Sequence, residues 1–251
     1  MKLGWVSSQW PRDDDAPALP GLLPGRYAGG AELLQDSMRS RAPEGVEVVE
    51  IRPGELELIE GCDDLVVAGL AGFPDHELDV LASRRPLAWI MSMPQPRELP
   101  LLEASRVVWA SPEMMGWFPW APKGEVCSGW FDTSGVPRGV EKHATALWAA
   151  RDHPQKGRMN ARLAAARLGV PLVELTGAPR EQVLEAMGTA AYFILLPKGA
   201  PDPCPTTVIE AEIAGCEIIV NRLVGRVPVR GSQAVVEYIE SLPERFYSWL
   251  S

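Results

Sequence analysis

Two carboxylates, Asp202 and Glu210, flank what the sequence predicts to be the start of a helix. A helix that begins at Pro205 or Thr206 would expose the amides of its first turn, with Thr206 or Thr207 able to cap it. Such an end attracts an anion. Glu210 falls about one turn further on, where its carboxylate could accept hydrogen bonds from a ribose diol. A Glu early in a helix is also common for helix-dipole reasons alone.

Two cations, Arg151 and Lys156, follow a strand predicted over residues 144–150 and precede another predicted helix. At the carboxyl end of a parallel strand, an Arg can hold a diphosphate by bidentate bonds and a Lys can act as a point charge. A solvated basic turn would contain the same residues.

A glycine pair, Gly29 and Gly30, follows the first predicted strand and opens a helix with Ala31 and Glu32. Glycines there would let a phosphate approach the backbone amides at the helix start. A Gly-Gly pair alone does not distinguish a phosphate site from an ordinary turn.

Short apolar runs alternate with segments of helical spacing, which is typical of parallel sheets with crossover helices and predicts an α/β protein. In the first half we predict strands over 3–7, 46–51, 65–68, 87–91 and 107–110, and helices over 31–41, 75–83 and 112–117. In the second half we predict strands over 144–150, 170–175, 192–196 and 217–220, and helices over 158–167, 179–187, 206–214 and 232–249. These elements place each candidate residue just after a strand or at a helix start.

The segment 119–139 is rich in Gly and Pro and lacks helical period, so we place a domain junction there. The predicted domains are 1–130 and 131–230, followed by a C-terminal helical segment over 231–251. Residues 11–26 follow the first strand and read as a substrate loop or an ordinary surface loop.

The composition indicates a folded protein, because 46% of the 251 residues are hydrophobic and 23% are charged. The net charge of −9 argues against a protein that coats nucleic acid or anionic membrane, although it permits a local basic patch. The four cysteines have no metal-site spacing, so reduced thiols are expected. We also expect no membrane span and no signal peptide, hence a cytoplasmic protein.

In this order the three candidate stretches resemble the retaining nucleotide-sugar glycosyltransferases of the two-Rossmann-domain GT-B architecture, in particular family 4. Gly29-Gly30-Ala31-Glu32 matches a Gly-Gly-x-Glu loop, and Arg151 with Lys156-Gly157 matches an Arg and Lys-Gly pair. Asp202 and Glu210 have the spacing of the family's two glutamates. Gly177 ends a Leu-Thr-Gly stretch that is similar to the strand end whose loop contacts the nucleotide base.

The resemblance implies two Rossmann-like domains facing across a cleft, with the C-terminal helix packing back on the first domain. It implies transfer of a sugar from a nucleotide-sugar donor with retention, without a metal or other cofactor. The diphosphate would be held by Arg151, Lys156, the Gly29 and Gly30 backbone and the amides near Thr206 and Thr207. Glu210 would orient the ribose, and Asp202 would contact hydroxyls of the donor sugar.

The chain departs from the family in three respects. Asp202 stands where a glutamate is usual, Ser92-Met93-Pro94 stands where a histidine is frequent, and the chain is shorter than typical members. These departures leave two alternatives open: a nucleotide-sugar binding protein without transfer activity, and a nucleotide-sugar epimerase or hydrolase on the same fold.

The acceptor could be a glycan, a small molecule or a modified base in DNA. Cations between Arg138 and Arg180 could form a basic face for DNA, although a solvated helix face explains the same charges. Trp10, Trp117 and Trp120 are candidates for an acceptor-binding platform, because aromatic faces stack on sugars and bases. Most of the other tryptophans are expected in the core.

Overall fold

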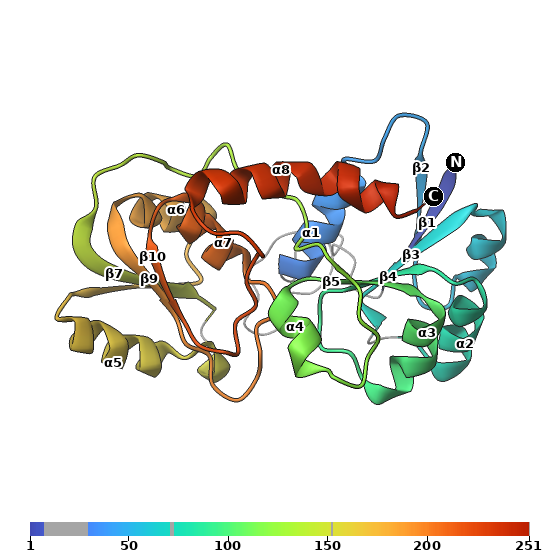
Figure 1. The fold of residues 1–251 in the computed structure, drawn as a ribbon, viewed down its shortest axis with the longest axis horizontal. Coiled ribbons are helices and arrows are strands. Elements are labelled where there is room, and N and C mark those ends of the chain that lie inside the picture. The colour runs from blue at the N-terminus through green and yellow to red at the C-terminus, as the bar shows by residue number, and fades with distance from the viewer. Residues whose placement is uncertain (8–29, 71–72, 152, 251) are drawn as a thin grey trace. The chain divides into compact units, whose positions relative to one another are not determined.

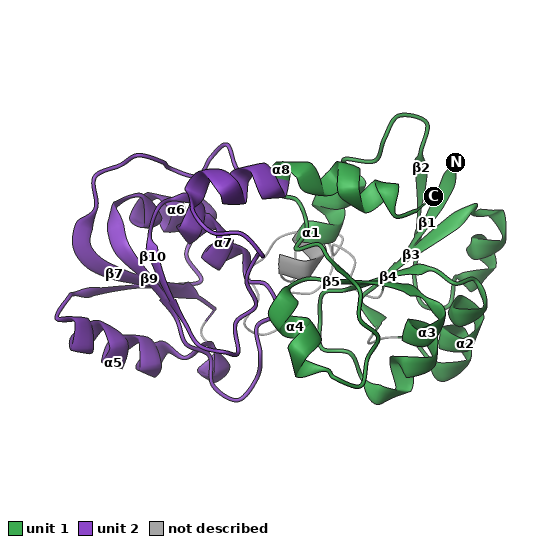
Figure 2. Cartoon of the chain, viewed as in Figure 1, with its two compact units in different colours: residues 1–17, 24–131, 240–251 green, residues 18–23, 132–239 purple. Residues whose placement is uncertain are grey.

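The computed structural model describes residues 1–7, 30–70, 73–151 and 153–250 (Figure 1). The chain divides into two compact units (Figure 2). The first unit contains the described residues up to Phe131 together with those from Glu240 onward, and the second contains those of Asp132–Ile239. Both units are built on parallel sheets, which confirms the predicted α/β class.

The first unit has a six-stranded parallel sheet in the order β2-β1-β3-β4-β5-β6. Its strands are β1 (Lys2–Val6), β2 (Glu47–Ile51), β3 (Asp64–Ala68), β4 (Leu87–Ile90), β5 (Arg106–Trp109) and β6 (Glu125–Val126). Its helices are α1 (Gly30–Arg39), α2 (Asp75–Ser83), α3 (Leu99–Ala104) and α4 (Pro112–Trp117), with 3-10 turns η1 (Leu56–Gly61) and η3 (Pro96–Glu98). The central strand β1 pairs with both β2 and β3, with Leu3 opposite Val48 on one side and Asp64 on the other.

Side chains of β1 alternate between two cores, as the strand geometry requires. Val6 belongs to a cluster with Val67, and with Leu81 of α2 and Leu101 of α3. The neighbouring Trp5 points to the opposite face, where its indole donates a hydrogen bond to Gln35 of α1. Helices therefore cover both faces of the sheet (Figure 1).

The last helix, α8 (Ser232–Ser248), begins in the second unit and ends in the first (Figure 2). Phe246 stacks on Trp5 with ring centroids 5.8 Å apart, and it also contacts Trp89 at 5.1 Å. The Tyr247 hydroxyl donates to the Met38 carbonyl oxygen at 2.9 Å. These contacts confirm that the C-terminal helix packs against the first domain.

The second unit has a four-stranded parallel sheet in the order β10-β9-β7-β8. Its strands are β7 (His143–Ala150), β8 (Leu172–Thr176), β9 (Ala190–Leu195) and β10 (Glu217–Val220). Its helices are α5 (Arg158–Leu168), α6 (Arg180–Thr189) and α7 (Thr206–Ile213), with a 3-10 turn η4 (Pro154–Lys156). Small residues of α5, Ala161 and Ala165, pack on Trp148 and Ile194, so this helix lies close to the sheet.

One short α-helix and one short strand were not predicted. The helix α3 has six residues and a proline near its start, and β6 has two residues inside the segment taken as a junction. Neither is long enough to establish a period in the sequence. The expectation of buried tryptophans is confirmed for Trp5, Trp89, Trp109 and Trp148, which are fully buried. No helix in the described part of the chain is long and apolar enough to cross a membrane.

Candidate functional site

The second unit has a topological switch point between β7 and β9. These strands are neighbours, but the chain visits β8 between them. The connections that follow β7 and β9 therefore leave the same edge of the sheet in opposite directions, and ligands of open α/β sheets bind at such a point. Arg151 and Lys156 lie on the first connection, and Asp202 lies on the second.

Lys156 and Asp202 form an ion pair at this edge, with Nζ and Oδ2 2.5 Å apart. The Lys156 side chain is one-third exposed and that of Asp202 is 14% exposed. The backbone of Lys156 is fixed from the core side, because the buried indole of Trp148 donates to its carbonyl oxygen at 3.1 Å. The structure thus brings together two predicted site residues that are 46 positions apart.

The backbone of Asp202 is held on both sides by the turn that follows β10. Its amide donates to the Leu223 carbonyl oxygen at 2.7 Å, and its carbonyl oxygen accepts from the Gly225 amide at 2.8 Å. Two carbonyl groups earlier in the connection from β9 to α7 accept hydrogen bonds from asparagine side chains. Asn221, after β10, donates to the Pro197 carbonyl oxygen, and Asn160 of α5 donates to the Leu196 carbonyl oxygen. The connection from β9 to α7 is therefore tied down by backbone and amide hydrogen bonds.

Gly157 has no room for a side chain. Its φ is +71°, and an ideal Cβ would lie 1.8 Å from the Leu196 carbonyl oxygen. We expect Gly157→Ala to destabilise the protein by more than the left-handed backbone alone costs, which is about 1–2 kcal/mol. Urea unfolding measures the difference. Gly169→Ala is the matched control, because Gly169 has a φ of +70° and nothing within 4 Å of its ideal Cβ. Equal losses in the two variants would contradict the steric argument.

The N-terminus of α7 lies four residues after Asp202. Its N-cap is Pro205 in an extended conformation, and no side chain caps it. The prediction that Thr206 or Thr207 caps this helix is wrong, since both lie inside its first turn. Their hydroxyls cannot adopt the N-cap geometry from helical positions. The first-turn amides are consequently not satisfied by a side-chain cap, which suits an anion.

Glu210 is only 4% exposed and lies on α7. Its Oε1 accepts a hydrogen bond from Arg180 Nε at 2.8 Å, and a second nitrogen of Arg180 donates to the Asp132 carbonyl oxygen. Burial raises the pKa of Glu210, and the Arg180 guanidinium opposes this rise. Arg180 thus engages Oε1 of this carboxylate.

Arg180 was not predicted as a partner of Glu210. Arg180 is the first residue of α6, where a positive charge is unfavourable because of the helix dipole. A cation at this position could have indicated that an acidic side chain lies nearby. Gly177, a predicted nucleotide contact, lies three residues earlier with a φ of +58°. Its amide donates to the Ala150 carbonyl oxygen at 3.4 Å, so the end of β8 stays beside the end of β7.

The remaining predicted site residues lie in the first unit or outside the described residues. Gly29 and Trp10 are outside them, and Gly30 is the first residue of α1. Trp117 ends α4. Trp120 is 39% exposed and packs edge-on against Phe118, whose ring stacks on Trp109. The exposed indole of Trp120 therefore has a firm aromatic support.

Several of the cations between Arg138 and Arg180 are engaged by neighbouring groups of the second unit. Arg158 and Arg162 both bind Glu174 and hold its pKa low, at about 2. Lys142 donates to the Met187 carbonyl oxygen. Arg138 binds Thr133. Local ion pairs and carbonyl contacts thus account for much of this charge.

Comparisons with known proteins identify the fold. No protein-family model and no curated protein sequence matches the chain. Solved structures do match, and they share the GT-B fold of glycosyltransferases. AviGT4, a glycosyltransferase involved in avilamycin A biosynthesis, is 15% identical with a TM-score of 0.55, over 99% of this chain and 92% of that one. HepE of Anabaena, in complex with UDP, is 11% identical with a TM-score of 0.54, over 97% and 90%.

Proposed function

We propose that this protein is a glycosyltransferase that moves a sugar from a nucleotide-sugar donor to an acceptor. One observation carries the proposal: the Lys156–Asp202 pair and the uncapped first turn of α7 lie at the carboxyl edge of one parallel sheet. A cation, a carboxylate and exposed amides are the groups that a sugar diphosphate needs. The GT-B fold, common to AviGT4 and HepE, supports the same reading.

In the proposed complex, Lys156, Arg151 and the amides of Thr206 and Thr207 bind the diphosphate. Negative charge develops there as the nucleoside diphosphate leaves, so these groups stabilise the transition state more than the ground state. Since protein cations do this work, we propose that no metal is required. Gly29 and Gly30 of the first domain would add backbone amides.

In this proposal, the carboxylates of Asp202 and Glu210 accept hydrogen bonds from hydroxyl groups of the donor. Asp202 accepts from hydroxyls of the transferred sugar, and Lys156 holds its carboxylate in position before the donor binds. Glu210 accepts from the ribose diol. We propose transfer with retention by a front-face route, in which the leaving diphosphate assists the acceptor and no protein nucleophile is needed.

Uracil is the first nucleotide base to test, because HepE was crystallised with UDP. The experiment incubates the protein with UDP-, GDP- and ADP-sugars carrying labelled sugar, with no acceptor. Slow release of free sugar from one donor supports a transferase that uses water in place of its acceptor. Binding without release supports the inactive binder, and an isomerised sugar supports the epimerase.

When EDTA is added to the reaction with the donor that releases sugar, the rate of release should not change, because Lys156 and Arg151 take the place of a metal. The rate is compared before and after dialysis against the chelator, and again after Mg²⁺ or Mn²⁺ is added back. A rate that falls with EDTA and returns with the ion would overturn metal independence.

The inactive binder has one observation in its favour. Asp202 is shorter than the glutamate of the resembled family and is already engaged by Lys156, so its reach to a sugar is reduced. Asp202→Glu therefore separates the two readings. Faster sugar release in this variant indicates a transferase limited by that reach, and no release in either protein indicates a binder.

Three classes of acceptor are candidates: a glycan, a small molecule and a modified base in DNA. Filter binding of a DNA oligonucleotide at increasing salt tests the last of these, since phosphate contacts make affinity fall steeply with salt. We propose a cytoplasmic location. The four cysteines all lie within the described residues and form no disulfide there, which suits a reducing compartment.

A further inference from the structure

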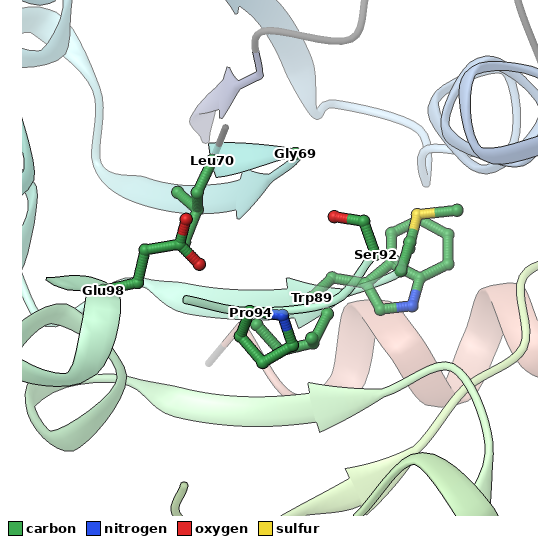
Figure 3. A pocket seen from close by; sticks show the side chains of 8 residues that line it. Gly69, Leu70, Trp89, Ser92, Pro94 and Glu98 are labelled. Atoms are coloured by element: carbon green, nitrogen blue, oxygen red, sulfur yellow. The ribbon is translucent and has the colours of Figure 1, made fainter. Parts of the chain in front are cut away.

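A small pocket opens in the first unit at the carboxyl ends of β3 and β4 (Figure 3). Gly69 and Leu70 line it from the end of β3, and Met91, Ser92 and Pro94 line it from the end of β4. Glu98, at the end of η3, closes another side. The pocket is about 210 Å³ in all, much of it open to solvent, with enclosed room for about one water molecule.

Glu98 is a buried carboxylate with half of its hydrogen-bonding capacity unused. It is 4% exposed, and its Oε2 accepts from the Gln95 amide at 3.1 Å, which closes the capping box of η3. Oε1 has no hydrogen-bond partner within the described residues. Burial raises the pKa of Glu98, and the hydrogen bond from Gln95 and the charge of Arg97 oppose that rise. Oε1 is not one of the buried atoms that lack a partner, so solvent reaches it at the pocket, where a donor group of a ligand can take the place of water.

Ser92 faces Glu98 across the pocket (Figure 3). Its hydroxyl has no hydrogen-bond partner among the described residues either, and Pro94 lies between the two as an apolar wall. One acceptor and one hydroxyl in a space of this size fit a single hydroxyl group, which donates to Glu98 and exchanges a second bond with Ser92. A carboxylate or phosphate in the same place would be repelled by Glu98.

We propose that Glu98 and Ser92 bind one hydroxyl group of a neutral carbohydrate and that Glu98 excludes anionic sugars from this place. The choice of a carbohydrate rests on the proposed transfer function. The hydroxyl belongs either to the acceptor or to the sugar of the donor, and the two sources share this chemistry. Glu98 is then a specificity-determining residue contributed by the first domain.

The experiment titrates the full-length ¹⁵N-labelled protein with glucose and with glucuronate. Glucose should shift the amide signals of Met91, Ser92 and Gln95, and glucuronate at the same concentration should leave them in place. In Glu98→Gln, which keeps an oxygen for the Gln95 amide, the affinity for glucose should fall about 5- to 10-fold, because a charged acceptor becomes neutral. Glu103→Gln, the same change at an exposed position of α3, should behave like the unaltered protein.

A second arm identifies the source of the hydroxyl. Calorimetry compares UDP with UDP-glucose in Glu98→Gln and in the unaltered protein. Weaker binding of UDP-glucose but not of UDP assigns the pocket to the donor sugar. Unchanged binding of both, with a slower glucose-dependent consumption of UDP-glucose, assigns it to the acceptor.

The inference is overturned if glucose leaves the pocket amides unshifted, if Glu98→Gln responds like the unaltered protein, or if glucuronate binds as well as glucose. Ser92→Ala gives an independent check, since it removes the second partner without touching the capping box. Failure of the proposed function is a different result: the unaltered protein would bind no nucleotide while its glucose titration still reached the pocket.

Discussion

Glu210→Gln is expected to weaken UDP binding about 10- to 100-fold, which corresponds to the roughly 1.5–3 kcal/mol of a hydrogen bond to a charged group. The carboxylate is 4% exposed on α7, so water cannot replace the ribose hydroxyls that the proposal assigns to it. Titration calorimetry measures the dissociation constant. The Arg180 side chain, 47% exposed, loses the negative charge of its partner in this variant but can still donate to the Gln oxygen and be solvated, so the fold should tolerate the change.

Glu212→Gln is the matched control for this result. Glu212 lies two residues further along the same helix and is also buried, but its partners are Arg226 and the Gly231 amide. This change should lower the melting temperature and leave UDP affinity unaltered. If both variants lose UDP affinity equally, the loss reflects damage to α7, and the assignment of Glu210 to the ribose fails.

A pH dependence follows from the same carboxylate. Burial raises the pKa of Glu210 above its usual value, with Arg180 as the charged group that faces it. Since the ionised form accepts the ribose hydroxyls, UDP affinity should fall as the pH decreases through this raised pKa. The fall should begin at a higher pH than an ordinary glutamate would give. Calorimetry across mildly acidic pH should find no such step in Glu210→Gln.

Lys156→Met is expected to slow sugar release from the donor about 10²- to 10³-fold, the usual effect of removing one group that stabilises developing charge. UDP binding should weaken much less, because Arg151 and the amides of α7 remain in the proposed site. Single-turnover measurements with labelled donor separate the two quantities. Lys198→Met is the control, since Lys198 is an exposed lysine on the connection that also contains Asp202.

The ion pair with Asp202 offers a second explanation for any effect at Lys156, namely loss of a structural contact. Asp202→Asn and the double variant Lys156→Met/Asp202→Asn test it. If the pair is only structural, the double variant should recover stability and turnover together, because no charge is left unpaired. If the pair serves the donor, the double variant should recover stability alone.

Much of the fold could be predicted from the sequence because most strands and helices are regular and amphipathic or apolar. The helix α2 and the strand β10 have the predicted bounds, and the Asp202 to Glu210 stretch lies on a connection and helix as expected. The short elements α3 and β6 were missed because their positions depend on neighbours in space. The family resemblance pointed to Lys156-Gly157, where the structure leaves no room for a Cβ at the glycine.

The candidate site was less accessible from the sequence than the fold. The Arg180–Glu210 and Lys156–Asp202 pairs join residues 30 and 46 positions apart, and only the strand order brings them together. The capping prediction at Thr206 and Thr207 failed because Pro205 took the N-cap position. Glu98 carried no motif at all. Its importance arises from burial and from an oxygen without a partner, which are properties of the folded chain.

The path of α8 has a consequence for synthesis on the ribosome. Phe246 and Tyr247 complete a core whose other members, Trp5, Met38 and Trp89, are made much earlier. Until residues 240–250 emerge, the face of the first sheet that contains Trp5 and Trp89 lacks the Phe246 ring, although all six strands of that sheet have already been made. The core of the unit that is translated first is therefore completed by residues that are translated after both sheets.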